Sequence, residues 1–555
     1  MRFRGAVLAT FSALLLALAL PNDLLPYGSP LFGVLALAPL LAAVYRTRSY
    51  AAAARLGVLF GAVSSVASNF WLVFFQSFSV WTLGGVTLAY AGYFAVLAPL
   101  LRFVAGALDS GPGGMPGGMA SAVLGGMGSA MPRAYRPIAV AALWTLYEFL
   151  KSSGFLGYPW GLIAYPVHAI TPLVQFVDIT GVWGLSLLMA LVNAVAAEWL
   201  DLALHGRRPP RPPARLWQTT GAAALLVAAA LGYGAVALGR PVPRAATLDV
   251  VLVQHNANPW QSGDDGGVLA TLQRLTREGV AADATPPDLV VWSETAVRWP
   301  VIGALAASSS DRDADGADAK PLVPGPLTGL PVALLTGVPW VVSEDPLAAM
   351  NAAALVAPGG AVLHHYGKQH LVPFAESVPF WEVPAIRRLF RDVIGLQATW
   401  VPGNSATIYE LPVRDGGTVR FATPICFEDA FPYLNRRFVR AGADLLINLT
   451  NDAWSQTVSA ETQHFVAARL RAVENRRVLI RATNGGVTAA VDPWGRLIGS
   501  PAPLFTETAL RLRVPVYRPA GDTVYTRFGD WLPALLGVLL VPLLVTRQRR
   551  AARTR

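Results

Sequence analysis

The chain has 555 residues, is 54% hydrophobic and only 14% charged, and has a mean hydropathy of +0.44. This composition is too apolar for an ordinary soluble protein, and the length leaves room for a membrane part beside a complete soluble domain. The net charge is +10, and the single cysteine, Cys426, excludes an internal disulfide bond.

Eight apolar stretches run along the chain, and most approach the about 20 residues that a helix needs to cross a bilayer. They lie at residues 6–20, 30–45, 56–75, 83–105, 137–150, 172–197, 216–238 and 530–546. We expect eight helical spans, because lipid offers no partner to open backbone groups. An alternative for the first stretch is a cleaved signal peptide, since it follows a basic MRFR segment and ends near Ala17-Leu18-Ala19.

Arginine gathers in alternate segments between these stretches, which predicts their orientation because basic loops stay in the cytoplasm. The arginines of these segments are Arg2, Arg4, Arg46, Arg48, Arg55, Arg102, Arg133, Arg136, Arg207, Arg208, Arg211, Arg215, Arg547, Arg549, Arg550, Arg553 and Arg555. The short loops between them hold one basic residue, Lys151. We therefore expect residues 240–528 to lie on the periplasmic side of the inner membrane.

These patterns predict three parts: a transmembrane domain of seven helices at 1–239, an extracytoplasmic domain at 240–528, and a final helix with a basic cytoplasmic tail at 529–555. Residues 240–546 hold 26 Lys and Arg against 28 Asp and Glu. The basic charge therefore belongs to the inner membrane face, which argues against nucleic-acid binding. A Gly/Met/Pro-rich loop at 106–132 and an acidic insertion at 308–320 are expected to carry no chemistry.

Short strands and helices alternate in the extracytoplasmic domain, which is typical of a layered α/β domain. The expected strands are 248–254, 288–292, 332–337, 352–357, 361–366, 419–424, 444–448, 478–481 and 487–491, and the expected helices are 269–282, 429–441 and 461–474. Cys426 ends the apolar segment FATPIC. A strand-to-helix turn is expected to favour a thiolate there; the alternative is a buried structural cysteine.

Two further polar residues end apolar strands: Glu294 in DLVVWSET and Lys368 after AVLHHYG. Each alone also fits a solvated strand end, but strand ends are where α/β sheets form sites. Together with Cys426 they supply what acyl transfer through a thioester needs. These needs are a nucleophile, a carboxylate base and a cation that stabilises an oxyanion.

The segments VVWSETAV, YGKQHLVPFAESVP and PICFEDAFP resemble the nitrilase (carbon–nitrogen hydrolase) superfamily with its Glu–Lys–Cys triad. Together with GFLGYPWG and GVWGLSLLMALVNA in the membrane part, they make the whole chain resemble the bacterial apolipoprotein N-acyltransferases. The resemblance implies an α/β fold: a nitrilase-like αββα sandwich inserted between the seventh and eighth helices of an eight-helix transmembrane bundle. It implies no cofactor and no metal.

By this resemblance Glu294 is the general base, Lys368 stabilises the oxyanion and Cys426 is the nucleophile. The resemblance also makes Glu376 and Glu428 accessory carboxylates. Phe427 and Asn351 are further candidates for accessory residues. Trp260 and Trp454 are candidates to line the substrate site, and for Trp454 a simple packing role fits equally well. The chain departs from the common family pattern at Ser293, Thr295, Ala375, Ser377 and Phe427. These departures bear on substrate preference rather than on the triad.

Other residues admit a structural and a functional interpretation. Glu148, at the end of the fifth stretch, is either a span-end charge or a ligand contact. Asn448 and Asn451 are candidates for orienting loops. Four histidines, His364, His365, His370 and His464, lack a convincing set of metal ligands. Residues 385–396 have an amphipathic helical pattern, which fits either a helix packed on its own domain or a lid at the membrane surface.

The resemblance implies transfer of a fatty acyl chain from a membrane phospholipid, through a cysteine thioester, to the N-terminal amine of the diacylglyceryl-cysteine of apolipoproteins. The enzyme is expected to act as a monomer in the bilayer. One alternative is a membrane-tethered nitrilase-type amidase that hydrolyses small amides. The other is a membrane scaffold without catalytic activity.

Overall fold

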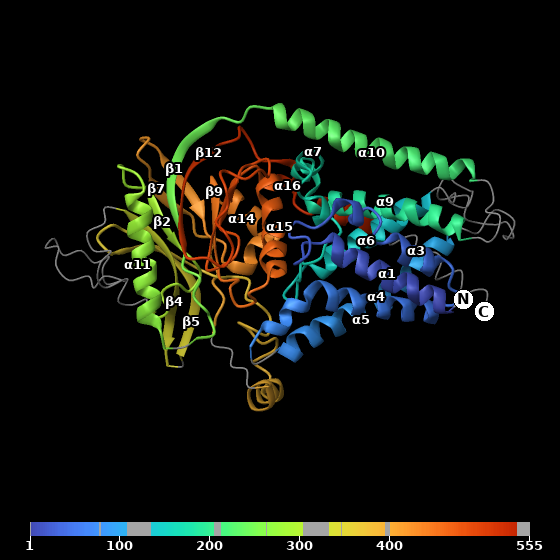
Figure 1. The fold of residues 1–555 in the computed structure, drawn as a ribbon, viewed down its shortest axis with the longest axis horizontal. Helices are drawn as coiled ribbons and strands as arrows, with labels where there is room; N and C mark the ends of the chain where they lie inside the picture. Colours follow the sequence, from blue (N-terminus) through green and yellow to red (C-terminus); the bar gives the residue numbers. More distant parts are fainter. Residues whose placement is uncertain are drawn as a thin grey trace. The chain divides into compact units, whose positions relative to one another are not determined.

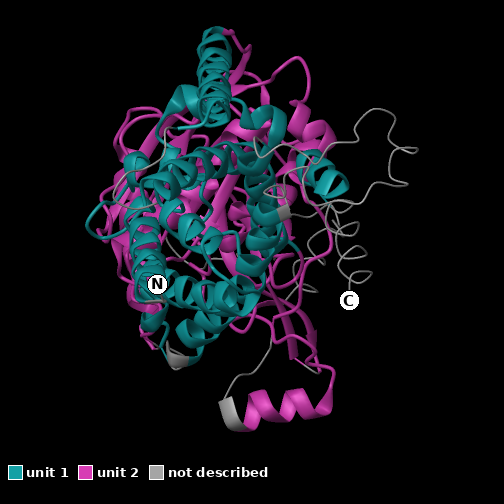
Figure 2. Ribbon diagram, turned by 90° about the vertical axis from the view of Figure 1, so that its right-hand side faces the viewer, with its two compact units in different colours: residues 1–153, 158–239, 530–555 teal, residues 154–157, 240–529 magenta. Residues whose placement is uncertain are grey.

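The computed structural model describes residues 2–76, 79–107, 135–204, 212–261, 263–302, 332–345, 347–394 and 400–540. The chain divides into two compact units, which Figure 2 colours separately. Residues 1–153, 158–239 and 530–555 form the helical unit, and residues 154–157 and 240–529 form the sheet unit. The acidic insertion at 308–320 and nearly all of the loop at 106–132 lie outside the described residues.

The helical unit is built from apolar helices of unequal length (Figure 1). They are α1 (Arg2–Ala19), α2 (Pro30–Gly33), α3 (Ala38–Tyr45), α4 (Tyr50–Asn69), α5 (Ser79–Ala107), α6 (Arg136–Lys151), α7 (Thr171–Val174), α8 (Val177–Thr180), α9 (Val182–Ala203) and α10 (Ala214–Gly239). Among the described residues, four segments are long and apolar enough to cross a membrane: Tyr50–Phe74, Trp81–Gly106, Val182–Ala203 and Ala214–Gly239. Shorter apolar helices lie at Phe3–Ala19, Pro30–Tyr45 and Trp531–Leu540.

The expected span at 172–197 is wrong in where it begins. Two short helices, α7 and α8, precede the long helix α9, which begins only at Val182. Gly181 separates α8 from α9 with a φ of 64°, a backbone conformation that a glycine adopts without the steric cost of a side chain. The apolar run in the sequence therefore predicted a buried or lipid-facing segment correctly, but it did not predict the residue at which the long helix begins.

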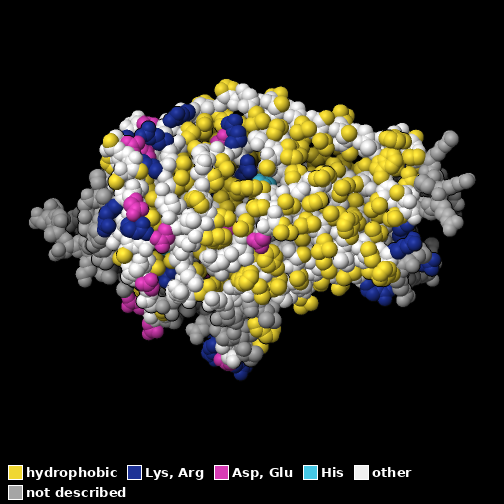
Figure 3. All heavy atoms as spheres, in the orientation of Figure 1, with side chains coloured by type: hydrophobic (Ala, Val, Ile, Leu, Met, Phe, Trp, Pro, Cys, Tyr) yellow, Lys and Arg dark blue, Asp and Glu magenta, His cyan; other side chains and the backbone are white. Residues whose placement is uncertain are grey.

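Large apolar side chains point outward from the long helices of the helical unit. Leu88 is 75% exposed, Val96 63%, Leu225 70% and Val236 58%. On the face drawn in Figure 3, hydrophobic side chains cover much of the helical unit, and charged side chains gather at one end of it. Soluble proteins rarely expose apolar patches this large, so these surfaces fit contact with lipid.

The sheet unit contains twelve strands among its described residues, in two mixed sheets. They are β1 (Arg244–Gln254), β2 (Leu289–Trp292), β3 (Val301–Ile302), β4 (Ala333–Glu344), β5 (Leu347–Val356), β6 (Val362–Gly367), β7 (Tyr409–Pro412), β8 (Thr418–Ala422), β9 (Leu445–Thr450), β10 (Val478–Thr483), β11 (Ala489–Val491) and β12 (Thr508–Tyr517). One sheet has the order β12-β1-β2-β4-β5-β6, with β3 beside β4, and the other has the order β11-β10-β9-β8-β7.

The two sheets contact each other through β1 and β10, and helices cover their outer sides. Helix α11 (Asp265–Ala281) packs on β1 and β12, and α14 (Pro432–Arg440) and α15 (Val458–Asn475) lie on the side of the second sheet (Figure 1). Apolar residues of both elements, such as Val251 and Leu272, form the core between α11 and its sheet. The layers therefore follow the order helix, sheet, sheet, helix, as expected from the sequence.

Some strands were not expected from the sequence. Strand β12 pairs antiparallel with β1 over residues 508–517, although its segment TALRLRVPVY alternates arginine with apolar residues. Strand β7 pairs with β8. Both strands lie at an edge of their sheet. Their polar side chains face away from the core, so they lack the continuous apolar sequence of a central strand.

Glycine is required at position 337 in β4, where the chain approaches the segment that carries Glu294. A Cβ at Gly337 would lie 2.3 Å from the backbone N of Thr295 and 2.7 Å from Glu294 Cα. We predict that Gly337→Ala lowers the free energy of unfolding by about 1–3 kcal/mol, because overpacking forces the backbone to move. Thermal unfolding of the purified protein measures this.

The matched control for this prediction is Gly359→Ala. A Cβ at Gly359 meets open space and the residue has no positive φ, so this variant should unfold at the wild-type temperature. A wild-type unfolding temperature for Gly337→Ala as well would contradict the prediction.

Candidate active site

Three polar side chains follow strands of the sheet unit that run in compatible directions. Glu294 comes shortly after β2, Lys368 directly follows β6, and Cys426 begins the short helical turn η6 (Cys426–Ala430) after β8. Strand β2 is parallel to β4, and two antiparallel steps relate β4 to β6, so β2 and β6 point the same way. Lys368 Nζ lies 3.1 Å from Glu294 Oε1, and the charges of both residues act on Cys426, so the three side chains lie near one another.

The Lys368 ammonium is buried between two carboxylates. Its Nζ donates to Glu294 Oε1 at 3.1 Å and to Glu376 Oε1 at 2.8 Å. Burial alone would lower the pKa of Lys368, but attraction to Glu294 and Glu376 outweighs it and raises the pKa well above its ordinary value. The lysine therefore stays positively charged at neutral pH.

Asn351, on β5, holds the two carboxylates together. Its Nδ2 donates to Glu294 Oε1 at 2.8 Å and to Glu376 Oε1 at 2.9 Å. Each carboxylate uses its second oxygen for a backbone N–H: Asn451 donates to Glu294 Oε2 at 2.9 Å, and Val372 donates to Glu376 Oε2 at 2.8 Å. The orientation of both carboxylates is thus fixed from three segments of the chain.

Cys426 occupies a strained position at the tip of its turn. Its φ is +51°, which is unusual for a residue other than glycine and is found at functional sites whose surroundings hold the strain. The side-chain amide of Asn448 donates to the carbonyl oxygens of Cys426 and Pro424, both at 3.1 Å. The turn is thereby held in place, and the cysteine remains partly exposed.

The expectation that this turn favours a thiolate is wrong for the resting site. Burial and the neighbouring Glu294 carboxylate raise the pKa of Cys426 well above its ordinary value, although Lys368 acts in the opposite direction. The turn η6 has only five residues, so its dipole is small beside the cost of removing a thiolate from water. The resting cysteine is therefore a thiol, and it needs a base to become a nucleophile.

Glu428 joins the segment that carries the lysine to the turn that carries the cysteine. The backbone N–H groups of Gln369 and His370 donate to its Oε1 at 2.7 and 3.0 Å, and the N–H of Ile425 donates to its Oε2 at 2.8 Å. Burial raises the pKa of Glu428 to about 7, and these N–H groups act in the opposite direction. One carboxyl group thus sets the spacing of two predicted site residues.

The two tryptophans expected at the substrate site contact each other. Trp260 Nε1 donates to the carbonyl oxygen of Trp454 at 3.2 Å. Trp260 follows β1 and Trp454 follows β9, and both side chains are partly buried. Trp454 lies three residues beyond Asn451, whose N–H contacts Glu294. The pair therefore lies on the segments that border the three polar side chains.

Phe427 and the amphipathic segment both carry large apolar side chains. Phe427 packs edge-on against Phe431 at 4.8 Å between ring centroids. The predicted helix at 385–396 is a short helix, α13 (Pro384–Arg388), continued by a wider turn, η5 (Leu389–Ile394). Within it, Leu389 is 49% exposed. Residues 395 and 396 lie outside the described residues.

Glu148 and Lys151 of the helical unit are engaged in local contacts. Glu148 accepts hydrogen bonds from Trp144 Nε1 at 3.0 Å, from the N–H of Ile163 at 2.8 Å and from Ser186 Oγ at 2.6 Å. Lys151 is buried and donates to Tyr90 Oη at 3.2 Å. Both side chains are therefore buried within their own unit, and the contacts of Glu148 are those of a structural residue.

The histidines do not gather into a metal site. Among the described residues, no group of three or more His, Cys, Asp or Glu side chains has the arrangement to hold a metal ion. His365 stacks on Trp340 at 4.0 Å between ring centroids. Burial and the Lys368 charge lower the pKa of His370 to about 4, so its ring is neutral at physiological pH. His464 contacts two buried carboxylates, those of Asp429 and Asp452.

Sequence reasoning missed several residues that shape the site. Tyr366, whose Oη donates to Glu428 Oε1 at 2.9 Å, was treated only as part of a strand. Asn484 donates to Asn451 Oδ1 at 2.9 Å from the end of β10 and was not singled out. Each is a polar residue at or near the end of an apolar strand. This pattern identified Lys368 and would have pointed to both residues.

The fold of the sheet unit agrees with a comparison of the chain with protein-family models. Residues 12–195 match the family model described as the apolipoprotein N-acyltransferase N-terminal domain, and residues 250–515 match the carbon-nitrogen hydrolase model. The sheet unit is thus of the carbon–nitrogen hydrolase class. An amidase from Nesterenkonia sp. AN1 is 19% identical, with a TM-score of 0.34, over 50% of this chain and 94% of its own.

Relatives along the whole chain are more specific. Apolipoprotein N-acyltransferase 2 of Treponema pallidum is 36% identical over 95% of this chain and 92% of its own length. Apolipoprotein N-acyltransferase 2 of Treponema denticola is 34% identical over 98% of both chains. The chain belongs to the apolipoprotein N-acyltransferase family.

The contacts of Glu428 generate a prediction. In Glu428→Gln the amide NH₂ cannot accept a hydrogen bond. The backbone N–H groups that donate to one of the two carboxylate oxygens therefore lose their acceptor, which should cost about 1–3 kcal/mol of stability. We expect the rate of acyl transfer to fall at least tenfold while the protein still folds. Rates with a phospholipid donor and a lipopeptide acceptor, together with thermal unfolding, measure both quantities.

Glu410→Gln is the control, because Glu410 is exposed on β7 of the same sheet unit. It should keep the wild-type rate. A rate close to wild type in Glu428→Gln would show that the spacing of the two segments does not depend on this carboxylate.

Proposed function

We propose that this chain transfers a fatty acyl group from a membrane phospholipid to the N-terminal amine of an apolipoprotein's diacylglyceryl-cysteine, through a thioester on Cys426. The observation that carries the proposal is the convergence of a thiol, a fixed carboxylate and a buried ammonium in a chain that belongs to this family. Family membership supplies the identities of donor and acceptor. The site supplies the reaction type.

In the first half of the reaction, Glu294 takes the proton of Cys426 as the sulfur attacks the ester carbonyl of the phospholipid. The pKa of the cysteine is raised, so this general base is needed. Lys368 stabilises the negative charge that develops on the carbonyl oxygen, because its own charge is held by two carboxylates. The proton on Glu294 then passes to the leaving alcohol, and a lysophospholipid departs.

In the second half, the α-amine of the acceptor attacks the thioester carbonyl. Glu294 accepts a proton from the amine, and the sulfur leaves and regains a proton, which restores the thiol and yields the N-acylated product. Glu376, Asn351 and Glu428 act as accessory residues that position the lysine and the base. The side chains of Trp260, Trp454 and Phe427 border the acyl chain, which favours an amine over water by keeping the site dry.

The proposed setting is the inner membrane, with eight spans. Residues 1–239 supply seven spans, residues 240–528 form the catalytic domain on the periplasmic side, and residues 529–555 return to the cytoplasm. Alternate arginine-rich segments support this orientation, and four apolar segments of sufficient length support a membrane location. Each acyl CH₂ drawn into water costs about 0.8 kcal/mol, so the proposed site of catalysis is the bilayer surface. The enzyme is proposed to act there as a monomer.

The test of the proposal is an intact-mass measurement. Purified protein is mixed with a phospholipid of defined chain length and no acceptor. We expect the mass to rise by one acyl group on Cys426, and to return to the starting value when a diacylglyceryl lipopeptide is added. Hydrolysis of small amides without an acyl adduct would instead support a membrane-tethered amidase and overturn the proposal.

Glu294→Gln provides the first variant test. Gln keeps the size of the side chain and one acceptor oxygen for Asn351 and Lys368, but it cannot take up a proton. We expect the appearance of the acyl adduct to slow by a factor of at least about 100, which is within the usual contribution of a general base. Rapid acylation of this variant, followed by mass spectrometry over time, would remove Glu294 from the role of base.

Cys426→Ser provides the second variant test. A hydroxyl is far harder to ionise than a thiol, so we expect neither an acyl adduct nor measurable transfer, while the unfolding temperature stays near that of the wild type. Transfer to a lipopeptide at a rate near that of the wild type would refute the role of Cys426 as nucleophile.

A further inference from the structure

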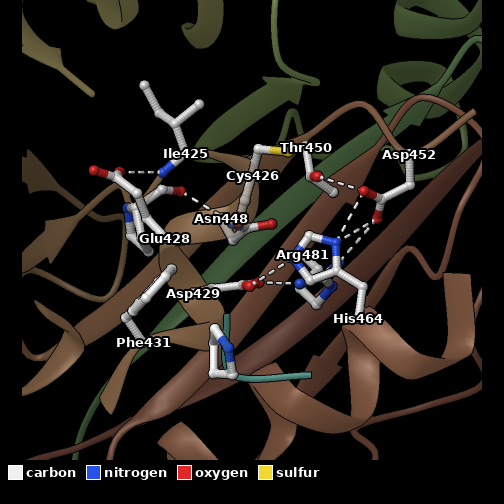
Figure 4. A network of polar contacts seen from close by, with 12 residues as sticks. Ile425, Cys426, Glu428, Asp429, Phe431, Asn448, Thr450, Asp452, His464 and Arg481 are labelled. Atoms are coloured by element: carbon white, nitrogen blue, oxygen red, sulfur yellow. Dashed lines mark hydrogen bonds and ion pairs between the residues drawn. The ribbon is translucent and has the colours of Figure 1, made fainter. Parts of the chain in front are cut away.

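The end of strand β9 carries two side chains toward the cysteine. Residues two apart on a strand point to the same face, so Asn448 and Thr450 share a face of β9, and Figure 4 shows both beside Cys426. Asn448 holds the carbonyl oxygen of Cys426. Thr450 lies beside Cys426 in Figure 4, and its side chain acts to lower the pKa of the thiol against the opposing effect of burial. The end of this strand therefore borders both the backbone and the sulfur of the nucleophile.

Thr450 is also bonded to a buried carboxylate on its other side. Its Oγ1 donates to Asp452 Oδ1 at 3.2 Å. Asp452 accepts from His464 Nδ1 at 2.8 Å, and His464 Nε2 donates to Asp429 Oδ1, also at 2.8 Å (Figure 4). Arg481 closes the network by ion pairs with Asp429 and Asp452. All four charged residues are buried.

The charges of this network compensate each other. Burial alone would lower the pKa of His464, but Asp452 and Asp429 raise it to about 9, so its ring is a cation that donates from both nitrogens. Burial would raise the pKa of Asp452, but His464 and Arg481 lower it. Two anions thus face two cations. Such an arrangement is costly to break but well suited to hold one acceptor oxygen in place.

We propose that the Thr450 hydroxyl is the side-chain donor that stabilises the Cys426 sulfur as it loses its proton, and that Asp452 is a positioning residue for that hydroxyl. In the resting site the hydroxyl donates to Asp452 and accepts from the thiol. When the thiol proton moves to Glu294, the hydroxyl turns and donates to the sulfur. Thr450 keeps its proton throughout, and Asp452 retains His464 and Arg481 as partners.

The inference rests on the proposed role of Cys426 as nucleophile, but it can be measured without acyl transfer. The charged groups that act on the sulfur are Glu294, Lys368 and Asp452, and burial together with the charge of Asp452 raises the pKa of the neighbouring Glu461. None of them is altered by substitution of Thr450. Since Cys426 is the only cysteine in the chain, alkylation reports on this sulfur alone.

The experiment measures the rate of iodoacetamide alkylation of the full-length protein at a series of pH values, with intact mass as the readout. The midpoint is the pH at which this rate is half of its maximum. We expect Thr450→Val, which keeps the shape of the side chain, to raise the midpoint by about one pH unit, because a hydrogen bond to a charged group is lost. Thr450→Ser should restore the midpoint to near the wild-type value. A midpoint in Thr450→Val equal to that of the wild type would overturn the proposal.

Thr462→Val is the matched control. Thr462 is also buried, but its hydroxyl donates to the carbonyl oxygen of Val458 within its own helix, so its loss should leave the midpoint unchanged. A shift in this control as large as that in Thr450→Val would attribute the effect to general loosening and overturn the proposal.

A double-mutant cycle tests the positioning role of Asp452. Asp452→Asn removes a negative charge near the sulfur and weakens the competitor for the hydroxyl, so we expect the midpoint to move downward. If part of that movement passes through Thr450, it will be smaller in the presence of Thr450→Val, and the two shifts will not add. Additive shifts would overturn the positioning role. Absence of an acyl adduct in the wild type would count against the proposed function alone.

Discussion

The site depends on one buried cation, Lys368, that shares its hydrogen bonds between the carboxylates of Glu294 and Glu376. An ammonium that is only 1% exposed as a side chain is tolerable in a protein interior only when opposite charge and hydrogen bonds surround it. Most of the neighbouring structure meets this requirement: Asn351 bridges the two carboxylates, and backbone N–H groups occupy their remaining oxygens. The cation can then act on a developing oxyanion with little rearrangement.

The strained cysteine follows from the same logic. A thiol whose pKa is raised by burial carries little thiolate at rest, and it therefore reacts slowly with electrophiles and oxidants. Reactivity then requires a base and donors arranged around the sulfur. The chain places these groups at the ends of strands in two sheets, and Glu428 links the lysine segment to the cysteine turn.

Behind the cysteine lies a second set of charges, those of Asp452, His464, Asp429 and Arg481. All four of these side chains are buried. The position of this network at the end of β9 and under η6 gives it a structural role. It ties Asp429 of η6 to Asp452, just after β9, through His464 and Arg481.

Much of this protein was readable from the chain alone. Apolar runs of membrane length, arginine in alternate segments and short β-branched strands with polar ends are local signals, and they identified the helical and sheet units and the three residues Glu294, Lys368 and Cys426. The family membership that these motifs indicated is confirmed by relatives that match along the whole chain. Local patterns suffice for these features because burial and charge act on each segment separately.

The tertiary structure decided what depends on neighbours distant in the sequence. The sequence could not show that Cys426 is a protonated thiol, because its pKa depends on burial and on Glu294, 132 positions earlier in the chain. The same holds for His464, for which the sequence indicated no role and which bridges two aspartates. The start of α9 at Val182 and the edge strands β7 and β12 also emerged only from packing. Electrostatic and hydrogen-bond partners depend on which segments the fold brings together, whereas the apolar pattern of a segment is visible in its own sequence.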